Sequence, residues 1–270
     1  MASRGTALLT ERVLALAGVA LLLLAAPSLS RPARAQVNVE GLRKALIDPG
    51  VHGSLSGSLT TYHGNTMGAE LGGSGLVGYR EDRQLAYLSA NSNYSRLGGE
   101  PRVANAFAHL RYNYLLGPRV AAEVFTQVES DRFRRLRLRS LVGIGPRFTI
   151  VEGEGGALFL GVSYMYVHTT LGASVADRPV RPADVHRLNN YAAILLVLEP
   201  GRATLGNTLY FQPRFDDLRD IQLLNVLSLD VTITGHLSAS LQSTLRYETP
   251  VPEPIKRADL AMKNLIGVAF

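Results

Sequence analysis

Hydrophobic and polar residues alternate along most of the chain in runs of about a dozen positions, which is the period-two pattern of β-strands. In one run, Val51, Leu55 and Leu59 share a face, whereas small polar residues occupy the other. Such runs exceed the ~5 to 6 residues of strands in soluble proteins and match tilted membrane strands of ~9 to 11. The pattern predicts twelve strands, near residues 51–63, 68–80, 84–95, 103–116, 119–129, 135–149, 157–168, 187–198, 202–212, 221–232, 236–247 and 259–270.

The connections between the predicted strands alternate between two kinds. One kind is mostly tight and rich in Gly or Pro, and it falls at residues 81–83, 117–118, 150–156, 199–201 and 233–235. The other kind is longer and polar or Pro-rich, and it includes residues 97–102, 169–186, 213–220 and 248–258. An even number of strands, with short turns on the periplasmic side and long loops outside, is typical of bacterial outer-membrane barrels.

The bulk of the two faces decides which face we expect to meet lipid. In the run 236–247, Leu237, Leu241 and Leu245 share one face, and mainly Ser, Gln, Thr and Arg share the other. In a soluble twelve-stranded barrel, neither face would fill the wide interior. In a membrane barrel, Leu and Val would face lipid and the polar residues would face a water-filled lumen, so no charge would lie in hydrocarbon. The sequence therefore predicts an all-β fold, a transmembrane antiparallel up-and-down β-barrel of about 12 strands. A secreted soluble β-sandwich is the alternative.

The first 35 residues have the features of a cleaved signal peptide. Arg4 and Arg12 give a positive start, residues 13–24 are uncharged, and residues 33–35 have the small-x-small form of a cleavage site. Twelve apolar residues are too few to cross ~30 Å of hydrocarbon as a helix. We therefore expect a signal peptide at 1–35, a periplasmic N-terminal segment at 36–50 and an outer-membrane β-barrel at 51–270, located in the bacterial outer membrane.

Composition excludes several classes of function. The chain has no Cys, so it has no disulfide framework, thiol nucleophile or thiolate metal site. Loss of the signal peptide removes four Arg and one Glu and takes the net charge from +6 to +3, which removes the main support for nucleic-acid binding. No His set with ligand spacing and no phosphate-binding Gly loop occurs. No cofactor or metal is expected.

Charged residues alternate on the two neighbouring strands predicted at 119–129 and 135–149. Extended backbone places Arg135, Arg137 and Arg139 on one face, whereas a helix would scatter them. A hairpin about residues 130–134 would pair Glu129 with Arg135, Gln127 with Arg137 and Phe125 with Arg139. We expect either a charged constriction that biases passage by ionic sign or a ladder that fills and stiffens the barrel. The expected lumen-lining residues are Glu123, Gln127, Glu129, Arg135, Arg137 and Arg139.

The chain ends in Phe270, and a terminal Phe on an alternating strand resembles the signal that the outer-membrane insertion machinery recognises. The expected partners are therefore that machinery and outer-membrane lipid, with no nucleic acid. Aromatic residues near the ends of the predicted strands would form the two girdles of a membrane barrel. These residues are Tyr62, Tyr79, Tyr94, Tyr112, Tyr114, Tyr164, Tyr166, Tyr191, Tyr210, Tyr247, Phe148, Phe211 and Phe270.

An enzyme that modifies lipids, of the phospholipase or lipid A deacylase type, is the alternative function. Outer-membrane phospholipases have a His and a Ser two residues apart on one strand, as in His52 with Ser54 and His236 with Ser238. Both pairs are predicted at the periplasmic end and on the lumen face, away from lipid, so we expect polar lumen residues and no enzyme. The carboxylates of Asp216, Asp217 and Asp220 have the chemistry of a divalent-cation site, but we expect them to be solvated.

An ordered set of motifs runs along most of the mature chain: GSLSGS at 53–58, GNT at 64–66, EVFTQ at 123–127, RF at 132–133, the segments 139–147 and 259–270, RY at 246–247, Pro250 and Pro252. This set resembles the salt-induced outer-membrane protein family, a domain-of-unknown-function family of outer-membrane β-barrels. The resemblance implies an outer-membrane β-barrel of unassigned activity, with no catalytic residue to carry over. The insert at 172–185 departs from the family pattern. From the polar face and the Arg residues we expect a non-enzymatic barrel, either a narrow passive pore or a structural or stress-related envelope component.

Overall fold

The computed structural model describes residues 49–62, 68–97, 100–101, 105–131, 136–171, 183–249 and 257–269. No helix in these ranges is long and apolar enough to cross a membrane. The elements found there are thirteen β-strands: β1 (Gly50–Tyr62), β2 (Gly68–Glu81), β3 (Gln84–Leu97), β4 (Glu100–Pro101), β5 (Asn105–Leu115), β6 (Val120–Asp131), β7 (Leu136–Gly153), β8 (Gly156–Leu171), β9 (Asp184–Glu199), β10 (Ala203–Pro213), β11 (Ile221–Thr232), β12 (Leu237–Glu248) and β13 (Ala258–Ala269).

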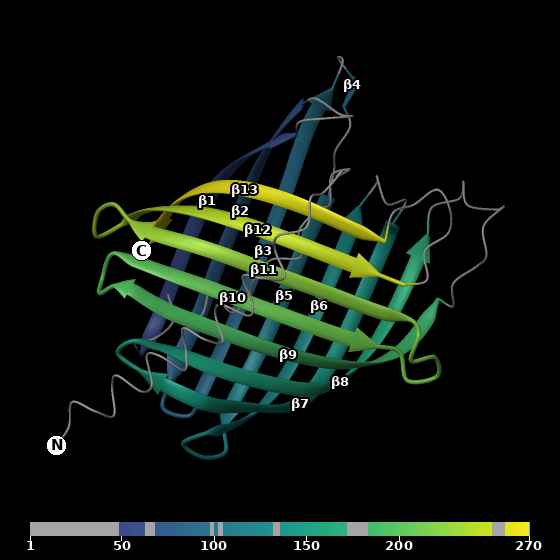
Figure 1. Cartoon of the computed structure of the whole chain (residues 1–270), viewed down its shortest axis with the longest axis horizontal. Helices are drawn as coiled ribbons and strands as arrows, with labels where there is room; N and C mark the ends of the chain where they lie inside the picture. Colours follow the sequence, from purple (N-terminus) through teal and green to yellow (C-terminus); the bar gives the residue numbers. More distant parts are fainter. Residues whose placement is uncertain are drawn as a thin grey trace. The chain divides into compact units, whose positions relative to one another are not determined.

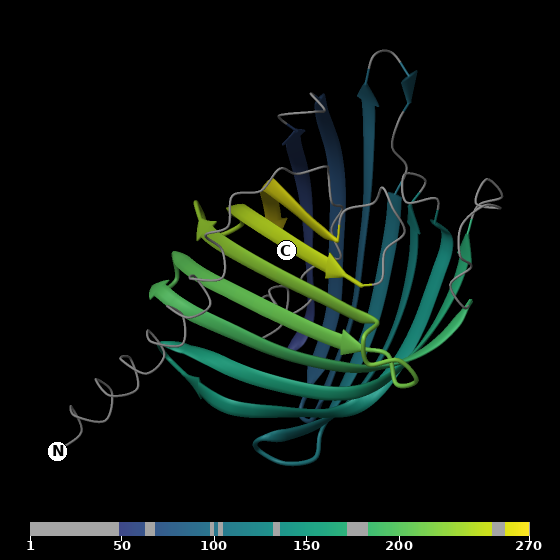
Figure 2. The same cartoon turned by 45° about the vertical axis from the view of Figure 1, so that its right-hand side comes forward.

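Twelve of these strands close into one antiparallel barrel, because each of them pairs with two neighbours (Figures 1 and 2). Strands consecutive in the chain pair around the sheet, and β1 pairs with β13 to close it. The two-residue β4 pairs only with the end of β3, so β3 and β5 are neighbours in the barrel. The predicted twelve-stranded up-and-down barrel is confirmed, and β4 lies inside a predicted connection.

The barrel has two different ends, which we call the turn end and the loop end. The turn end holds the first residue of β1, the last of β13 and the connections 82–83, 116–119, 154–155, 200–202 and 233–236. The loop end holds the connections 63–67, 98–104, 132–135, 172–183, 214–220 and 249–257. Asp82 and Gly201, with φ of 43° and 73°, adopt the left-handed backbone that tight turns favour.

Two predicted connections are too long. β7 continues to Gly153 and turns at residues 154–155, so the turn predicted over 150–156 is mostly strand. β8 continues to Leu171 and β9 begins at Asp184, so both ends of the loop predicted over 169–186 belong to the sheet. In both places Gly, Thr or charged residues suggested a connection, but the residues are part of strands because they pair with the neighbouring strands.

The two faces of the barrel wall differ in exposure. Large apolar side chains point outward into open space, and the exposed fractions of Val51, Leu71 and Ile266 are 71%, 68% and 64%. The alternate residues are buried, and both Glu123 and Arg147 are only 2% exposed. A closed barrel covers only its inner face, so the buried rows line the interior. The Leu and Val rows therefore form the outer surface.

Apolar residues also occur on the inner face, which the sequence pattern did not predict. They form three clusters along the inner wall. Tyr191 and Tyr210, which were expected in an outer girdle, belong to one of them because strand parity turns both rings inward. The clusters are Leu76, Leu85 and Tyr87; Phe125, Leu141, Met165 and Val167; and Tyr191, Ala193, Tyr210, Leu224 and Val226.

Three predicted features lie outside the described residues. They are the signal peptide at 1–35, most of the N-terminal segment at 36–50, and Phe270. Five of the predicted girdle residues are exposed on the outer face near the ends of their strands, namely Tyr79, Tyr94, Tyr112, Tyr114 and Phe211. Tyr164 is also exposed on the outer face, but it lies in the middle of β8 and not near an end.

Candidate functional site

The register between β6 and β7 differs from the predicted one. Glu129 lies opposite Arg139, not Arg135, and Gln127 lies opposite Leu141. Asp131 pairs with Leu136, so the connection is 132–135 and not 130–134, and the ladder also shifts between Glu129 and Asp131, as at a β-bulge. The predicted pairs of Arg135, Arg137 and Arg139 with Glu129, Gln127 and Phe125 are therefore wrong.

The predicted ladder of three arginines is interrupted as well. A second shift, between β7 and β8, lies at Leu136 and Leu138, so the inward and outward positions exchange there. Arg137 is exposed, whereas Arg139 is half-buried and donates a 2.9 Å hydrogen bond to Oε1 of Gln222 on β11. Arg135 lies outside the described residues. Of the three, the structure places only Arg139 among inner-face contacts.

Glu123 lies at the centre of a buried group on the inner wall. Arg111 on β5 donates a hydrogen bond of 3.1 Å from Nη1 to its Oε2, and both side chains are at most 3% exposed. The Tyr191 hydroxyl on β9 donates a second hydrogen bond, of 3.0 Å, to the same oxygen. The Arg111 guanidinium also lies 5.7 Å from the centre of the Tyr191 ring. Gln127 and Glu129 are buried on the same face of β6.

Aromatic rings continue this group toward β3. The ring of His109 stacks on Phe107 at 6.3 Å and on Phe125 at 6.0 Å, and lies 6.4 Å from Tyr87. We call the inner face of β3 and β5 to β9 the packed wall, defined by Tyr87, His109, Arg111, Glu123 and Tyr191. Each of these side chains is at most 4% exposed, so they cover one another.

The opposite stretch of the inner face has small, half-exposed polar side chains. They come from β1, β2 and β12, and we call them the serine wall: Ser54, Ser56, Ser74, Ser238, Ser240 and Gln242. Nearby, Lys263 donates a 3.2 Å hydrogen bond to Asn93, and the Asp230 carboxylate accepts hydrogen bonds from Ser228 and Ser240. The lumen therefore has one bulky side and one small polar side that carries both signs of charge.

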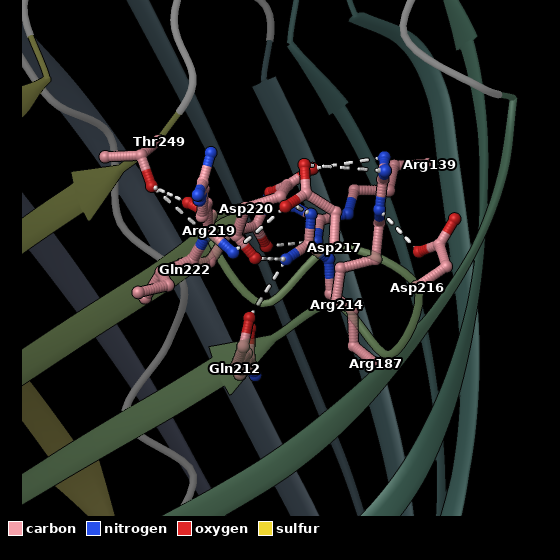
Figure 3. A network of polar contacts seen from close by, with 11 residues as sticks. Arg139, Arg187, Gln212, Arg214, Asp216, Asp217, Arg219, Asp220, Gln222 and Thr249 are labelled. Atoms are coloured by element: carbon pink, nitrogen blue, oxygen red, sulfur yellow. Dashed lines mark hydrogen bonds and ion pairs between the residues drawn. The ribbon is translucent and has the colours of Figure 1, made fainter.

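An ionic network lies at the loop end, around the connection between β10 and β11 (Figure 3). Arg187 donates to the Asp220 carboxylate at 2.7 Å and to the carbonyl oxygen of Gln212 at 2.9 Å. The guanidinium of Arg214 lies among three carboxylates, at 2.6 Å from Asp216, 3.4 Å from Asp220 and 3.8 Å from Asp217. We call the residues Arg187, Arg214, Asp216, Asp217 and Asp220 the mouth network.

The acidic loop was expected to be solvated, but Asp220 is only 4% exposed and its carboxylate is paired with Arg187 and Arg214. The three carboxylates of this loop are arranged around the guanidinium of Arg214, which already supplies the positive charge. Among the described residues, no group of three or more His or acidic side chains has an arrangement that would hold a metal ion.

The two His and Ser pairs considered from the sequence both lie toward the turn end. His52 and Ser54 are half-buried on β1, where Ser54 faces Leu76 of β2, a buried residue. His236 lies in the turn before β12, and Ser238 Oγ donates to the carbonyl oxygen of Gly267. Neither serine lies on the apolar outer surface.

Solved structures with a similar fold include outer-membrane porins and channels of low sequence identity. The NanC porin has a TM-score of 0.51 at 11% identity, over 81% of this chain and 98% of that one. An outer membrane channel from Pseudomonas putida F1 gives 0.48 at 11% identity, over 88% and 100% of the two chains. The KdgM porin gives 0.45 at 9% identity, over 81% and 98%. The NanC porin supports the barrel fold and no further conclusion.

A family-level match is also found. No curated protein matches the sequence. The family model described as "Protein of unknown function, DUF481" matches residues 55–270, which is most of the chain and all twelve strands of the barrel apart from the start of β1. The chain therefore belongs to this family.

Proposed function

We propose that this protein is an integral barrel of the bacterial outer membrane and acts as a narrow passive pore for small polar solutes. The observation that carries the proposal is the contrast between the two sides of its wall. The outer face exposes rows of Leu, Val and Ile, and the inner face includes the half-exposed serine wall. Lipid suits the first surface and water the second, and closure leaves no strand edge unpaired.

The asymmetry of the connections supports an orientation in this membrane. Short turns at the end that holds both barrel termini are typical of the periplasmic side, and long connections are typical of the outside. Exposed tyrosines near both ends of the strands suit the two interfaces, where an amphipathic ring is favoured. The signal peptide expected at 1–35 would bring the chain to this compartment.

The solute path follows the serine wall, because the packed wall fills the other side of the lumen. Both Lys263 and Asp230 border this path, so we expect weak ionic selectivity in the barrel itself. The mouth network adds a charged constriction at the outer end of the path. The lumen carries out no chemistry in this proposal.

Single-channel recording in planar bilayers tests the pore directly. Ser74→Trp places a large ring on the serine wall, and we expect it to lower the conductance at least about twofold, since pore diameter limits ion flow. Gly73→Trp is the matched control, because Gly73 is exposed on the outer face of the same strand and a side chain there meets open space. Folding of each variant is checked by heat-modifiable gel mobility. Absence of conductance in folded wild-type protein contradicts the pore.

A structural envelope barrel without a through-path is the second candidate. The buried ion pair of Arg111 with Glu123 and the apolar inner clusters favour it, because such contacts fill and stiffen a lumen. Folded, non-conducting protein together with weakened envelopes in deletion cells is the result that this candidate predicts. A role in salt stress, which the family resemblance implies, predicts a higher protein level after an increase in external salt, measured by immunoblot.

A further inference from the structure

Three polar side chains meet on the outward face of β8 and β9 near the loop end. His168 and Thr170 alternate with inward residues on β8, and Asp184 begins β9 directly opposite His168. Nδ1 of His168 lies 2.8 Å from Oδ1 of Asp184, and Nε2 of His168 lies 3.5 Å from Oγ1 of Thr170. The imidazole therefore connects a carboxylate on one side to a hydroxyl on the other.

The carboxylate fixes the chemistry of the imidazole. The Asp184 carboxylate accepts a hydrogen bond from Nδ1–H, so the ring proton stays on Nδ1 and the lone pair of Nε2 faces the Thr170 hydroxyl. The hydroxyl of Tyr166 also donates to Oδ1 of Asp184 and holds the carboxylate in place. A hydroxyl, an imidazole and a carboxylate in this order form the arrangement that activates a hydroxyl nucleophile in acyl transfer.

The surroundings are suited to a lipid. The side chains of His168 and Asp184 are 43% and 55% exposed, so the group is open to a molecule outside the barrel. An aromatic patch adjoins it, in which Tyr164 stacks on His186 at 5.8 Å and lies 6.1 Å from Phe215. Apolar Leu160 and Val162 continue the same row of β8 toward the turn end. An amphiphile with its acyl chain along this row would have its ester group near Thr170.

We propose that Thr170, His168 and Asp184 form a hydrolytic site for ester-linked acyl chains of lipids in the outer leaflet. The assignment goes beyond the pore and rests on the proposed membrane location only for the identity of the substrate. Thr170 is the nucleophile, His168 is the general base, and Asp184 orients and stabilises the imidazole. This group was not predicted from the sequence, because Thr170 and Asp184 fall in residues 169–186, which were assigned to a loop.

The reaction needs only water as a second reactant. Oγ1 of Thr170 bonds to the carbonyl carbon while its proton passes to Nε2 of His168. The bond between that carbon and the alcohol oxygen of the lipid breaks, and this oxygen takes the proton from His168. Water then adds to the acyl-threonine ester, gives a proton to His168 and releases the fatty acid. The Thr170 hydroxyl regains its proton from His168 as the ester bond breaks.

The test uses the refolded full-length chain in detergent micelles and two readouts. A fluorophosphonate probe labels an activated hydroxyl, and mass spectrometry locates the label. Fatty-acid release is measured from mixed micelles of phosphatidylethanolamine, and separately of lipopolysaccharide, which distinguishes the two sources of ester. We expect label on Thr170 and a loss of labelling and release of about 100-fold or more in Thr170→Ala and His168→Gln. Thr170→Ser should retain both.

His52→Gln is the matched control, since His52 belongs to the His and Ser pair at the turn end, and it should leave both readouts unchanged. Folded wild-type protein without label and without release overturns the proposal, as does release that Thr170→Ala does not alter. Conductance measured on the same samples distinguishes the failure of this proposal from the failure of the pore proposal. A barrel that conducts ions without hydrolysing lipid contradicts only the hydrolytic site. A barrel that hydrolyses lipid without conducting ions contradicts only the pore.

Discussion

The hydroxyl of Tyr191 on β9 donates a 3.0 Å hydrogen bond to Glu123 on β6, although β7 and β8 lie between these strands. Small inward-facing residues on the intervening strands leave space for this contact. A Cβ at Gly161 would lie only 2.1 Å from Cε1 of Tyr191, and a Cβ at Gly143 would lie 2.2 Å from Cζ of Phe125. The packed wall therefore depends on glycines that allow rings to lie flat over the sheet.

Gly161→Ala tests this dependence. The added methyl group collides with the Tyr191 ring, and overpacking of this kind costs about 1 to 3 kcal/mol. Gly73→Ala is the control, because its side chain would meet open space on the outer face. Urea unfolding in lipid vesicles, followed by tyrosine fluorescence since the chain has no Trp, measures the difference. Equal unfolding free energies for both variants would show that Tyr191 does not need the space.

Glu123→Ala removes the carboxylate beside a buried guanidinium. Because Arg111 and Glu123 are at most 3% exposed, we expect a loss of about 3 to 5 kcal/mol in the free energy of unfolding. Replacement of both partners, by Arg111→Met with Glu123→Leu, should recover most of that loss. The same urea unfolding assay completes a double-mutant cycle. A double variant as unstable as the sum of both single variants contradicts a direct coupling.

The strands could be predicted from the sequence because alternation is a local property of each run. Pairing between β6 and β7 could not, since a bulge of one residue leaves the composition unchanged and yet exchanges the two faces. Tyr191 and Tyr210 were assigned to a girdle by their distance from the strand ends, but they pair with each other and alternation turns both rings inward. Strand number follows from periodicity, and register depends on irregularities that only the paired structure shows.

Arg139 and Arg137 test the corrected register. Arg139→Ala removes a charge that reaches across the inner face to Gln222, so it should change the conductance or the ion selectivity of the pore. Arg137→Ala makes the same chemical change at an exposed position and should leave both unchanged within error. Planar-bilayer recording in a salt gradient provides the measurement. Equal effects of the two variants would contradict the corrected register and support the predicted ladder, in which both arginines face the lumen.

Arg214→Ala tests the mouth network. Without the guanidinium, the carboxylates of Asp216, Asp217 and Asp220 lose a shared positive partner, so the mouth becomes more negative and cation selectivity should rise. The β10–β11 connection should also become easier to cut with protease. Arg219→Ala is the control, because it removes the same charge from the same connection while Arg214 stays in place. If Arg219→Ala shifts the reversal potential as far, the arrangement around Arg214 has no special effect.

The group of His168, Thr170 and Asp184 proposed as a hydrolytic site on β8 and β9 could not be predicted from the sequence. His168 and Thr170 have the spacing that was examined at His52 and His236, but the following stretch was interpreted as loop from residue 169 onward. The two strands extend further than their composition indicates, because each is held by its neighbour, and this extension brings Asp184 opposite His168. Pairing between strands, and not local composition, therefore determines where β8 ends and β9 begins.

The orientation of the two faces is tested most directly by spin labels on single cysteines, which label specifically since the chain has no Cys. Labels at residues 238 to 244 of β12 in reconstituted vesicles are compared for collision with oxygen, which dissolves in lipid, and with a water-soluble nickel complex. We predict that Ala239, Leu241 and Ser243 positions favour oxygen and that Ser238, Ser240 and Gln242 positions favour nickel. The reverse alternation, or no alternation at all, would contradict a barrel with lipid outside and water within.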